Sequence, residues 1–275
     1  MLKLFFRFIK YYFRAKTRYD VHSPFVYDFV ENVLEDDRWF YAFSEIEAYR
    51  QWLLVNPARI EIADFGAGSQ VEASKVRKVS SLARYSANRP YTCQLLFRAI
   101  QHYKPKNLLE LGTSLGISTV YQAAAALDSR LVTIEGCPNT AHHATETFRY
   151  LKAQNVALLE GRFDEVLPEA IAELGTLDYV FVDGNHRREP TLRYFEKCLQ
   201  HAHPGSVFVF DDIHWSEEME AAWASIQAHP QVKITLDLFF FGIVFFREEQ
   251  LEKEHFTLIR WLWKPWAIGF WDFFK

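Results

Sequence analysis

The chain has 275 residues, a formal net charge of −4 and three cysteines, and 49% of its residues are apolar while 24% are charged. These proportions predict a packed globule and exclude disordered, collagen-like and coiled-coil chains. The near-neutral charge excludes a general nucleic-acid binder, which would carry a basic surplus. The cysteines form no CxxC pair, so we expect neither a structural zinc site nor a disulfide framework.

The first 18 residues are basic and rich in aromatic side chains. Lys3, Arg7, Lys10 and Arg14 recur at helical spacing and fall on one narrow face of a predicted helix. Two interpretations stay open. The helix packs its broad aromatic face on the rest of the protein and leaves its cations in water, or residues 1–18 lie on a membrane surface or dock a partner.

No segment contains the roughly 20 consecutive apolar residues that a membrane-spanning helix needs. The basic first segment has no small-residue cleavage site after it, so we do not interpret it as a signal peptide. We therefore expect a cytoplasmic protein. Peripheral contact with the inner membrane surface and a homodimer stay open.

Downstream of residue 105, short apolar runs alternate with longer helical patterns. Such alternation is typical of βαβ units and of a parallel sheet covered on both faces. We predict an α/β fold with a doubly wound, Rossmann-like sheet of seven strands, the last two forming an antiparallel hairpin at the sheet edge. The predicted strands are 107–111, 131–134, 156–159, 177–182, 206–210, 232–238 and 242–246, and the predicted helices are 117–127, 140–153, 164–174, 189–200 and 216–228.

This pattern divides the chain into three predicted parts. Residues 1–89 form a helical, aromatic-rich cap or lid, residues 90–250 form the sheet domain, and residues 251–275 form an aromatic extension. The surplus of Phe and Trp lies mainly in the two flanks and in the predicted hairpin. We therefore expect these regions to contact the substrate, a partner or a membrane.

Glycines and acids follow the first two predicted strands, and in doubly wound sheets the ligand binds beyond the carboxyl ends of the strands. The first strand runs into Glu110-Leu111-Gly112-Thr113-Ser114-Leu115-Gly116, whose glycines allow a tight turn close to a ligand. Its ExGxxxG spacing differs from the dinucleotide pattern GxGxxG, which argues against hydride chemistry. Glu135 ends the second strand, where an acid can accept both hydroxyls of a ribose.

Three further strand ends also carry acids. The third strand is followed by Glu160-Gly161-Arg162-Phe163-Asp164, in which Arg162 and Phe163 are candidate adenine contacts. The fourth strand ends in Asp183-Gly184-Asn185-His186 and the fifth in Asp211-Asp212-Ile213-His214. Each of the last two segments places a histidine three residues after an acid, which makes both candidates for catalysis.

The ordered motifs resemble those of the class I S-adenosylmethionine-dependent methyltransferases. Residues 108–116, LLELGTSLG, resemble the first motif of that family, VLELGTGxG, and residues 132–135, VTIE, resemble its ribose-binding strand end. Residues 178–186, DYVFVDGNH, are similar to the DxVFIDGxH of catechol O-methyltransferase-like enzymes. The resemblance covers about residues 90–246.

The resemblance implies transfer of a methyl group from S-adenosylmethionine to a small molecule, most simply at oxygen. It implies cofactor contacts from Glu110, Gly112, Thr113, Ser114, Gly116, Ser118, Glu135, Arg162, Phe163 and Asp183. In the catechol-type enzymes a divalent cation is held at positions that match Asp183, Asp211 and Asp212, an oxygen set suited to Mg²⁺ or Mn²⁺. At the position of that family's general-base lysine this chain has His186, which is therefore a candidate base. Together with Asp183 and His214 from the strand-end segments, it makes up the candidate catalytic residues.

Two other functions stay open. One is a metal-independent methyltransferase that acts on nitrogen or oxygen with His186 as the base. The other is a non-catalytic module that binds S-adenosylmethionine at a membrane or in a complex.

The stretch Asp64–Ser69 also resembles a first methyltransferase motif, DxGAGS. No strand with a terminal acid follows it, so we prefer the later motif. We interpret the stretch either as a glycine-hinged flap, with Arg77, Lys78 and Arg84 facing an anion, or as a solvated loop.

Overall fold

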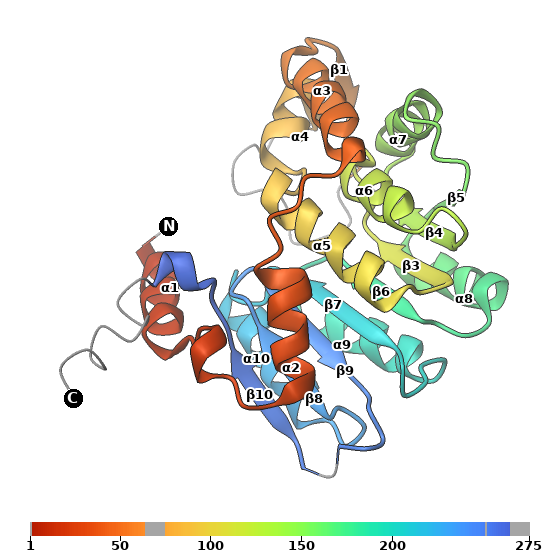
Figure 1. The fold of residues 1–275 in the computed structure, drawn as a ribbon. Coiled ribbons are helices and arrows are strands. Elements are labelled where there is room, and N and C mark those ends of the chain that lie inside the picture. The colour runs from red at the N-terminus through yellow and green to blue at the C-terminus, as the bar shows by residue number, and fades with distance from the viewer. Residues whose placement is uncertain (1, 64–74, 251, 265–275) are drawn as a thin grey trace.

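The computed structural model describes residues 2–63, 75–250 and 252–264 of the chain. A central sheet lies between two layers of helices (Figure 1). The helices are α1 (Leu2–Arg14), α2 (Pro24–Phe29), α3 (Tyr41–Val55), α4 (Val79–Tyr85), α5 (Pro90–Tyr103), α6 (Ile117–Ala125), α7 (Pro138–Tyr150), α8 (Phe163–Leu174), α9 (Arg188–Leu199) and α10 (Glu217–Ala228), with short helical turns η1 (Arg18–Asp20), η2 (Val30–Leu34) and η3 (Trp261–Trp263). The strands are β1 (Arg59–Glu61), β2 (Val76–Lys78), β3 (Asn107–Leu111), β4 (Arg130–Glu135), β5 (Val156–Glu160), β6 (Tyr179–Val182), β7 (Val207–Asp211), β8 (Ile234–Asp237), β9 (Phe241–Phe245) and β10 (Glu254–Thr257).

The main sheet has eight strands in the order β10-β8-β9-β7-β6-β3-β4-β5. Strands β3 to β7 pair in parallel, and β9 pairs antiparallel with both β7 and β8. The predicted α/β class and the hairpin are confirmed. The structure adds β10, which pairs in parallel with β8, so the hairpin is not the edge of the sheet and the sheet continues past residue 250.

Strand β10 carried little signal in the sequence. It is four residues long and reads Glu-His-Phe-Thr, with neither a continuous apolar run nor a clear alternation. Its strand conformation follows from pairing with β8, which is a long-range contact.

The two faces of the sheet bury separate sets of side chains, because neighbouring residues of a strand point to opposite faces. On one face, Leu108 packs with side chains of α5, α6 and α7. On the other face, Leu109 packs with α8, α9 and α10. Phe29 and Phe43 from the N-terminal segment are fully buried in the same cluster as Leu108. Residues 21–55 therefore share one core with the sheet.

Helix α1 packs only part of its aromatic side on the protein: Tyr11 is buried, and Phe8 packs edge-on against Phe239 at 5.0 Å. Among its cations, Arg7 donates to Glu220 of α10 at 2.9 Å and the exposed Lys3 pairs with Glu217 at 3.1 Å, while Lys10 and Arg14 are exposed. The aromatic side chains Phe5 and Phe6 point outward and are 57% and 63% exposed. The first interpretation holds in part: the two lysines are exposed as expected, but the aromatic side is divided between packed and outward side chains. Arg7 is held by Glu217 and Glu220, two of the three acids with which α10 begins.

The glycine-rich stretch Asp64–Ser69 lies outside the described residues, so its interpretation as a flap stays a prediction. The strands on either side of it, β1 and β2, pair antiparallel. Strand β1 lies beside the start of α7, since Asn139 Nδ2 donates to the Glu61 carbonyl at 2.8 Å. Within the described ranges, no helix is long and apolar enough to cross a membrane.

Candidate functional site

The predicted motifs meet along one edge of the sheet. In the order β7-β6-β3-β4, the carboxyl ends of adjacent strands carry Asp211, Asp183, the loop after Leu111, and Glu135. Parallel pairing places these ends side by side. One ligand can therefore reach all of them.

The loop after β3 requires glycine at its first position. Gly112 has φ +105°, and a Cβ there would lie 1.9 Å from the Asp183 carbonyl oxygen. The Gly112 amide donates to the Ile134 carbonyl at 3.0 Å, and the Asp183 amide donates to the Leu111 carbonyl at 2.8 Å. The loop is thus held between the ends of β4 and β6. Gly116, with φ +81°, starts α6 close to the ring of Phe148.

Several residues without a glycine's freedom also adopt left-handed backbone at these strand ends. Ser114, Asn185, His186 and Asp212 have φ values of +50°, +66°, +25° and +54°. Such conformations cost free energy and persist where surrounding contacts impose them, often at functional sites. Their gathering at three strand ends supports this edge as the functional one.

Glu135 is fixed at the end of β4 by two backbone donors. Its Oε2 accepts from the Ser114 amide at 2.8 Å and its Oε1 accepts from the Cys137 amide at 2.9 Å. Burial raises the pKa of Glu135, against the lowering effect of these donors. Each carboxylate oxygen has a further lone pair, so Glu135 retains the capacity to accept from a ligand hydroxyl.

Glu110 lies one layer below this edge, fully buried against α6. Its carboxylate accepts from Ser118, Thr119, Gln122 and Thr133 at 2.8, 2.5, 2.6 and 2.7 Å. Ser118, predicted to contact the cofactor, therefore donates to Glu110. Thr113, another predicted contact, joins the network through Thr133, 2.6 Å away. As placed, these three side chains brace the loop from below, and direct cofactor contact by them stays a prediction.

We expect Glu110→Gln to change how stability depends on pH. Burial raises the pKa of Glu110 from its usual 4.5 to about 7. The folded protein thus binds more protons than the unfolded chain between these values, and its free energy of unfolding falls as pH rises through them, by on the order of 3 kcal/mol. In Glu110→Gln the amide does not titrate, so this pH-dependent decrease in the free energy of unfolding should disappear. Denaturant unfolding between pH 4 and 8 measures the free energy of unfolding, with exposed Glu165→Gln as the control. An unchanged slope in Glu110→Gln contradicts the assignment.

The three predicted metal-binding aspartates interact with one another. Asp183 and Asp211 share a carboxyl–carboxyl hydrogen bond, and the negative charge of Asp212 acts on both. Burial, first, and this mutual repulsion raise the pKa of Asp183 and of Asp211; burial also raises the pKa of Asp212. Buried carboxylates that crowd one another favour a positive partner, either a proton or a cation.

The chemistry of Asp183, Asp211 and Asp212 suits a hard divalent cation such as Mg²⁺, since all the ligand atoms they offer are carboxylate oxygens. In the part of the chain that the structure describes, no three His, Cys, Asp or Glu side chains are arranged to hold a metal ion. The metal set therefore stays a prediction.

The two candidate catalytic histidines have different surroundings. His186 Nε2 lies 3.6 Å from Asp183 Oδ1, at the end of β6. Both ring nitrogens of His214 contact carboxylates: Nδ1 is 3.0 Å from Glu220 and Nε2 is 2.9 Å from Asp237. Although burial disfavours its cation, these two partners raise the pKa of His214. Since a base needs a free ring nitrogen, His186 is the better placed of the two.

The structure brings one residue to the site that the motifs did not reveal. Asn88 Nδ2 donates to Asp183 Oδ2 at 2.6 Å. Buried Arg50 of α3 donates to the Asn88 carbonyl at 2.6 Å and to Glu47 at 2.9 Å. Glu47 also accepts from the Tyr121 hydroxyl of α6 at 2.8 Å. The N-terminal segment thus supports Asp183, at the end of β6, through a polar network. The only local sign of this network in the sequence is an Asn just before Arg89-Pro90.

The predicted adenine contacts lie at the start of α8. The ring of Phe163 lies against Gly184, where a Cβ would approach it to 2.7 Å, and it packs edge-on against Tyr194 at 5.6 Å. This places Phe163 beside the loop after β6. Arg162 Nε lies 3.7 Å from Glu165 Oε1. The two roles toward adenine stay predictions.

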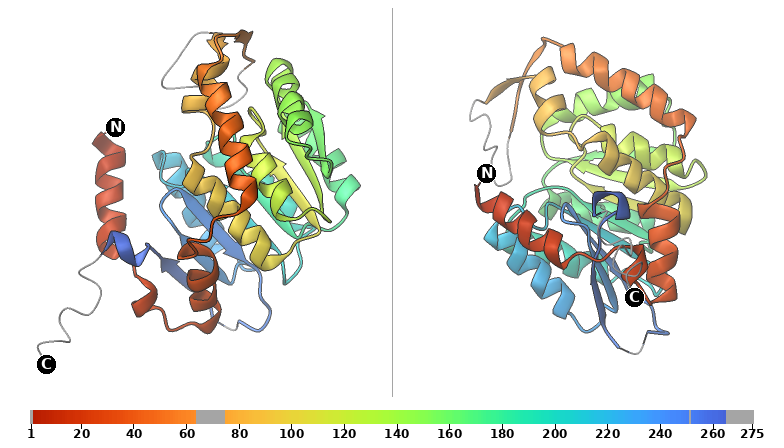
Figure 2. Two further views of the ribbon diagram at one scale, coloured as in Figure 1. Left: turned by 45° about the horizontal axis from the view of Figure 1, so that its top comes forward. Right: turned by 60° about the vertical axis from the view of Figure 1, so that its left-hand side comes forward.

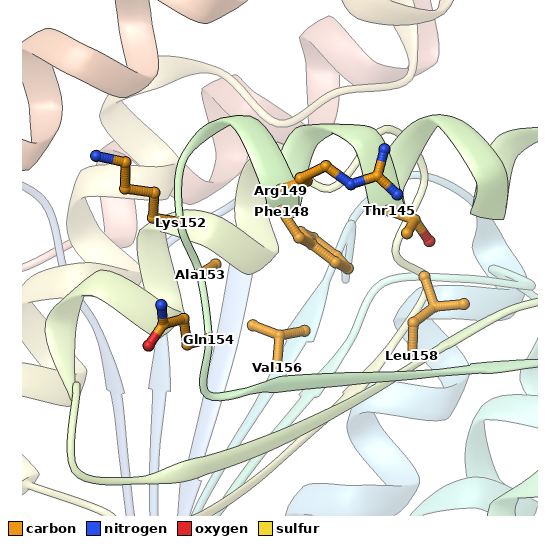
Figure 3. Close-up of a pocket in the computed structure, with 8 residues that line it drawn as sticks. All are labelled: Thr145, Phe148, Arg149, Lys152, Ala153, Gln154, Val156 and Leu158. Carbon is orange, nitrogen blue, oxygen red and sulfur yellow. The ribbon is translucent and has the colours of Figure 1, made fainter.

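A cavity of about 510 Å³ lies elsewhere, between α7 and the edge strand β5. Figure 3 shows Phe148 and Arg149 on the helix above Val156 and Leu158 on the strand. None of the predicted site residues lines it. We therefore build the functional argument on the strand-end motifs and not on this cavity.

Comparisons with known proteins agree with the motifs. A family model described as a methyltransferase domain matches residues 109–213. A catechol O-methyltransferase from Niastella koreensis is 33% identical over 131 residues, which are 46% of this chain and 57% of that protein. A catechol O-methyltransferase from Sus scrofa is 31% identical over 125 residues, which are 44% of this chain and 67% of that protein. The chain thus spans just over half the length of the Niastella protein.

Solved structures show the same fold. An O-methyltransferase from Bacillus cereus in complex with S-adenosylhomocysteine has a TM-score of 0.53 and 19% identity, covering 80% of this chain and 96% of its own. A methyltransferase from Podospora anserina with the same ligand has a TM-score of 0.58 and 15% identity, covering 83% and 98%. Sheet order and strand-end motifs define the chain as one of the class I methyltransferase fold. It belongs to the catechol O-methyltransferase-like family of S-adenosylmethionine-dependent O-methyltransferases.

Proposed function

We propose that this protein transfers a methyl group from S-adenosylmethionine to a hydroxyl of a small molecule, with a divalent cation beside the acceptor. One observation carries the proposal. The loop at Gly112 and Glu135 lie on adjacent strand ends, and Asp183 and Asp211 follow on the next two. A cofactor site and an acidic site therefore share one edge, in contact at Gly112 and Asp183.

The cofactor side is proposed to work by position and hydrogen bonding. Glu135 accepts from the ribose hydroxyls, and its orientation is set by the Ser114 and Cys137 amides. The Gly112–Gly116 loop lets the ligand approach the backbone, and Phe163 offers an aromatic face to adenine. Bound S-adenosylmethionine supplies the methyl group on a positively charged sulfur.

The acidic side is proposed to hold and deprotonate the acceptor. Asp183, Asp211 and Asp212 are the residues that would hold a divalent cation, which when bound lowers the pKa of a coordinated hydroxyl. Asn88 orients the Asp183 carboxylate by donating to its Oδ2. His186, 3.6 Å from the other oxygen of Asp183, is placed to receive the proton from the acceptor.

We expect Glu135→Gln to weaken binding of S-adenosylhomocysteine by about ten- to a hundredfold, because hydrogen bonds to a charged acceptor are each worth about 1.5–3 kcal/mol. Isothermal titration calorimetry measures the affinity. Glu160→Gln is the matched control, since Glu160 pairs in register with Glu135 but is exposed at the end of β5. Equal affinity in the two variants removes Glu135 from the cofactor site, and a thermal melt shows that both fold.

Methyl transfer itself is tested with catechol, the acceptor in the names of two relatives. We expect methylation that depends on added Mg²⁺ or Mn²⁺ and stops with EDTA. Full turnover in EDTA contradicts the proposal that a divalent cation takes part, and leaves His186 as the base. Cofactor binding without methylation of any hydroxyl acceptor contradicts the enzymatic proposal.

A further inference from the structure

The outward side of α1 carries several exposed apolar side chains close together. Its exposed side chains, here called the aromatic face, are Leu2, Phe5, Phe6 and Phe13, which are 71%, 57%, 63% and 74% exposed. Figure 2 shows α1 on the outside of the molecule, beside α10. Exposed apolar residues gathered in this way mark an interaction surface, whereas single ones need no explanation.

The orientation of α1 is fixed by contacts on its opposite side. Arg7 donates to Glu220 at 2.9 Å and to the Trp215 carbonyl at 3.2 Å. The Tyr11 hydroxyl donates to the Leu258 carbonyl next to β10, and Phe8 packs edge-on against Phe239 at 5.0 Å. The helix is thus attached by its polar and inner aromatic side chains. Rotation that would bury the aromatic face against the protein would break these contacts.

Cations border the aromatic face. At 100° per residue, Lys10 falls next to Phe6, and Arg14 follows it on the basic strip, between Lys10 and Arg7; both are exposed. Helix α1 contains no acid. The arrangement has an apolar arc with a basic border along one helix, which is the pattern of helices that lie in the interface of anionic membranes.

Two more partly exposed apolar side chains lie in η3, near the C-terminal end of α1, where the ring of Trp263 also packs against Tyr91 with 5.2 Å between centroids. Leu262 and Trp263 of η3 are 51% and 46% exposed. They are joined to α1 because the Tyr12 hydroxyl donates to the Trp263 carbonyl at 2.7 Å, and Lys264 donates to the Ala15 carbonyl at 2.6 Å. Trp beside a cation is typical of the membrane–water boundary, where the ring sits at headgroup level.

We propose that the aromatic face of α1, together with Leu262 and Trp263, binds the surface of an anionic lipid bilayer. A second copy of the chain is a poorer occupant. In a symmetric dimer the same patch faces itself, so Lys10 and Arg14 of both copies would be brought together around the contact. Anionic headgroups instead complement these cations while the acyl region takes the aromatic rings.

The test uses the full chain in flotation with two kinds of vesicle: phosphatidylcholine alone, and phosphatidylcholine mixed with phosphatidylglycerol. We expect binding to the mixed vesicles, with Phe5→Ser/Phe6→Ser lowering the partition coefficient at least about tenfold. Lys10→Gln/Arg14→Gln lowers it by about thirtyfold on mixed vesicles and little on neutral ones, since each cation near an anionic surface contributes roughly fivefold. Raised salt has the same effect as the charge variant.

The matched control is Leu127→Ser/Val55→Ser, which removes two apolar side chains: Leu127, 77% exposed after α6, and Val55, 76% exposed at the end of α3. It should bind vesicles like the unaltered protein. Thermal melts and S-adenosylhomocysteine affinity verify folding of every variant and separate this result from the proposed function. The proposal is overturned if the unaltered protein stays unbound, if Phe5→Ser/Phe6→Ser binds equally, or if light scattering shows a dimer that this variant splits.

Discussion

Gly112→Ala should destabilise the fold by at least about 4 kcal/mol, a size of effect that single substitutions reach only through a severe clash or cavity. A methyl group at this position would lie 1.9 Å from the Asp183 carbonyl oxygen, which is backbone. Neither partner can yield alone, because the Gly112 amide is bonded to β4 and the Asp183 amide to β3. Relief of the clash must separate the Gly112–Gly116 loop from the end of β6.

Gly175→Ala provides a control that separates this clash from backbone strain. Gly175 also has a positive φ, +75°, but nothing lies within 4 Å of a Cβ built there. Strain alone, at φ +75° and ψ −86°, should therefore cost about 1–3 kcal/mol. Denaturant unfolding gives both values, and calorimetry gives the S-adenosylhomocysteine affinity of whatever folded protein remains. Similar losses in the two variants would show that the close approach at Gly112 is not what the loop depends on.

Asp183→Asn should separate activity from stability. On the proposed function, turnover falls by about a thousandfold, because the variant loses a charge from the group that holds the cation and orients the acceptor. The amide carbonyl still accepts from Asn88, so the local hydrogen bond survives. Stability should stay equal or rise, because one of three buried carboxylates that repel one another is neutral.

Three measurements are compared for this variant: catechol turnover, the melting temperature, and the shift of that temperature on adding Mg²⁺. We expect the turnover and the Mg²⁺ shift to be lost together while the melting temperature holds. Exposed Asp128→Asn is the control and should leave all three unchanged. Turnover within tenfold of the unaltered protein would place Asp183 outside the reacting centre. A retained Mg²⁺ shift would place the cation elsewhere.

The strands of the parallel sheet and the residues at their ends could be predicted because their signals are local. A continuous run such as Leu108–Leu111 is apolar since both faces of the sheet are covered, and a loop such as Gly112–Gly116 needs glycine for its own backbone. Parallel topology then brings the strand ends to one edge without further information. The family and fold followed from this order of motifs.

Residue roles that depend on partners far along the chain were not visible in the sequence. Asn88 contacts Asp183 across 95 positions, and Arg50 reaches Asn88 across 38. His214 follows an acid just as His186 does, yet its ring is enclosed by Glu220 and Asp237. Local spacing cannot distinguish a histidine with a free nitrogen from one with both nitrogens engaged.

The sequence by itself determined the α/β class, the alternation of strands and helices along the chain as far as the hairpin, and the methyltransferase motifs at the strand ends, because periodicity and turn chemistry act over a few residues. Only the tertiary structure decided the pairing of β10, the network that supports Asp183, and the direction in which α1 faces. The basic and aromatic pattern of α1 allowed either side to pack inward. Tyr11 and Phe8 pack on the protein, and the acids at the start of α10 hold Arg7 beside them, since opposite charges brought together by the fold attract whatever their separation in sequence. The aromatic face of α1 is left outward.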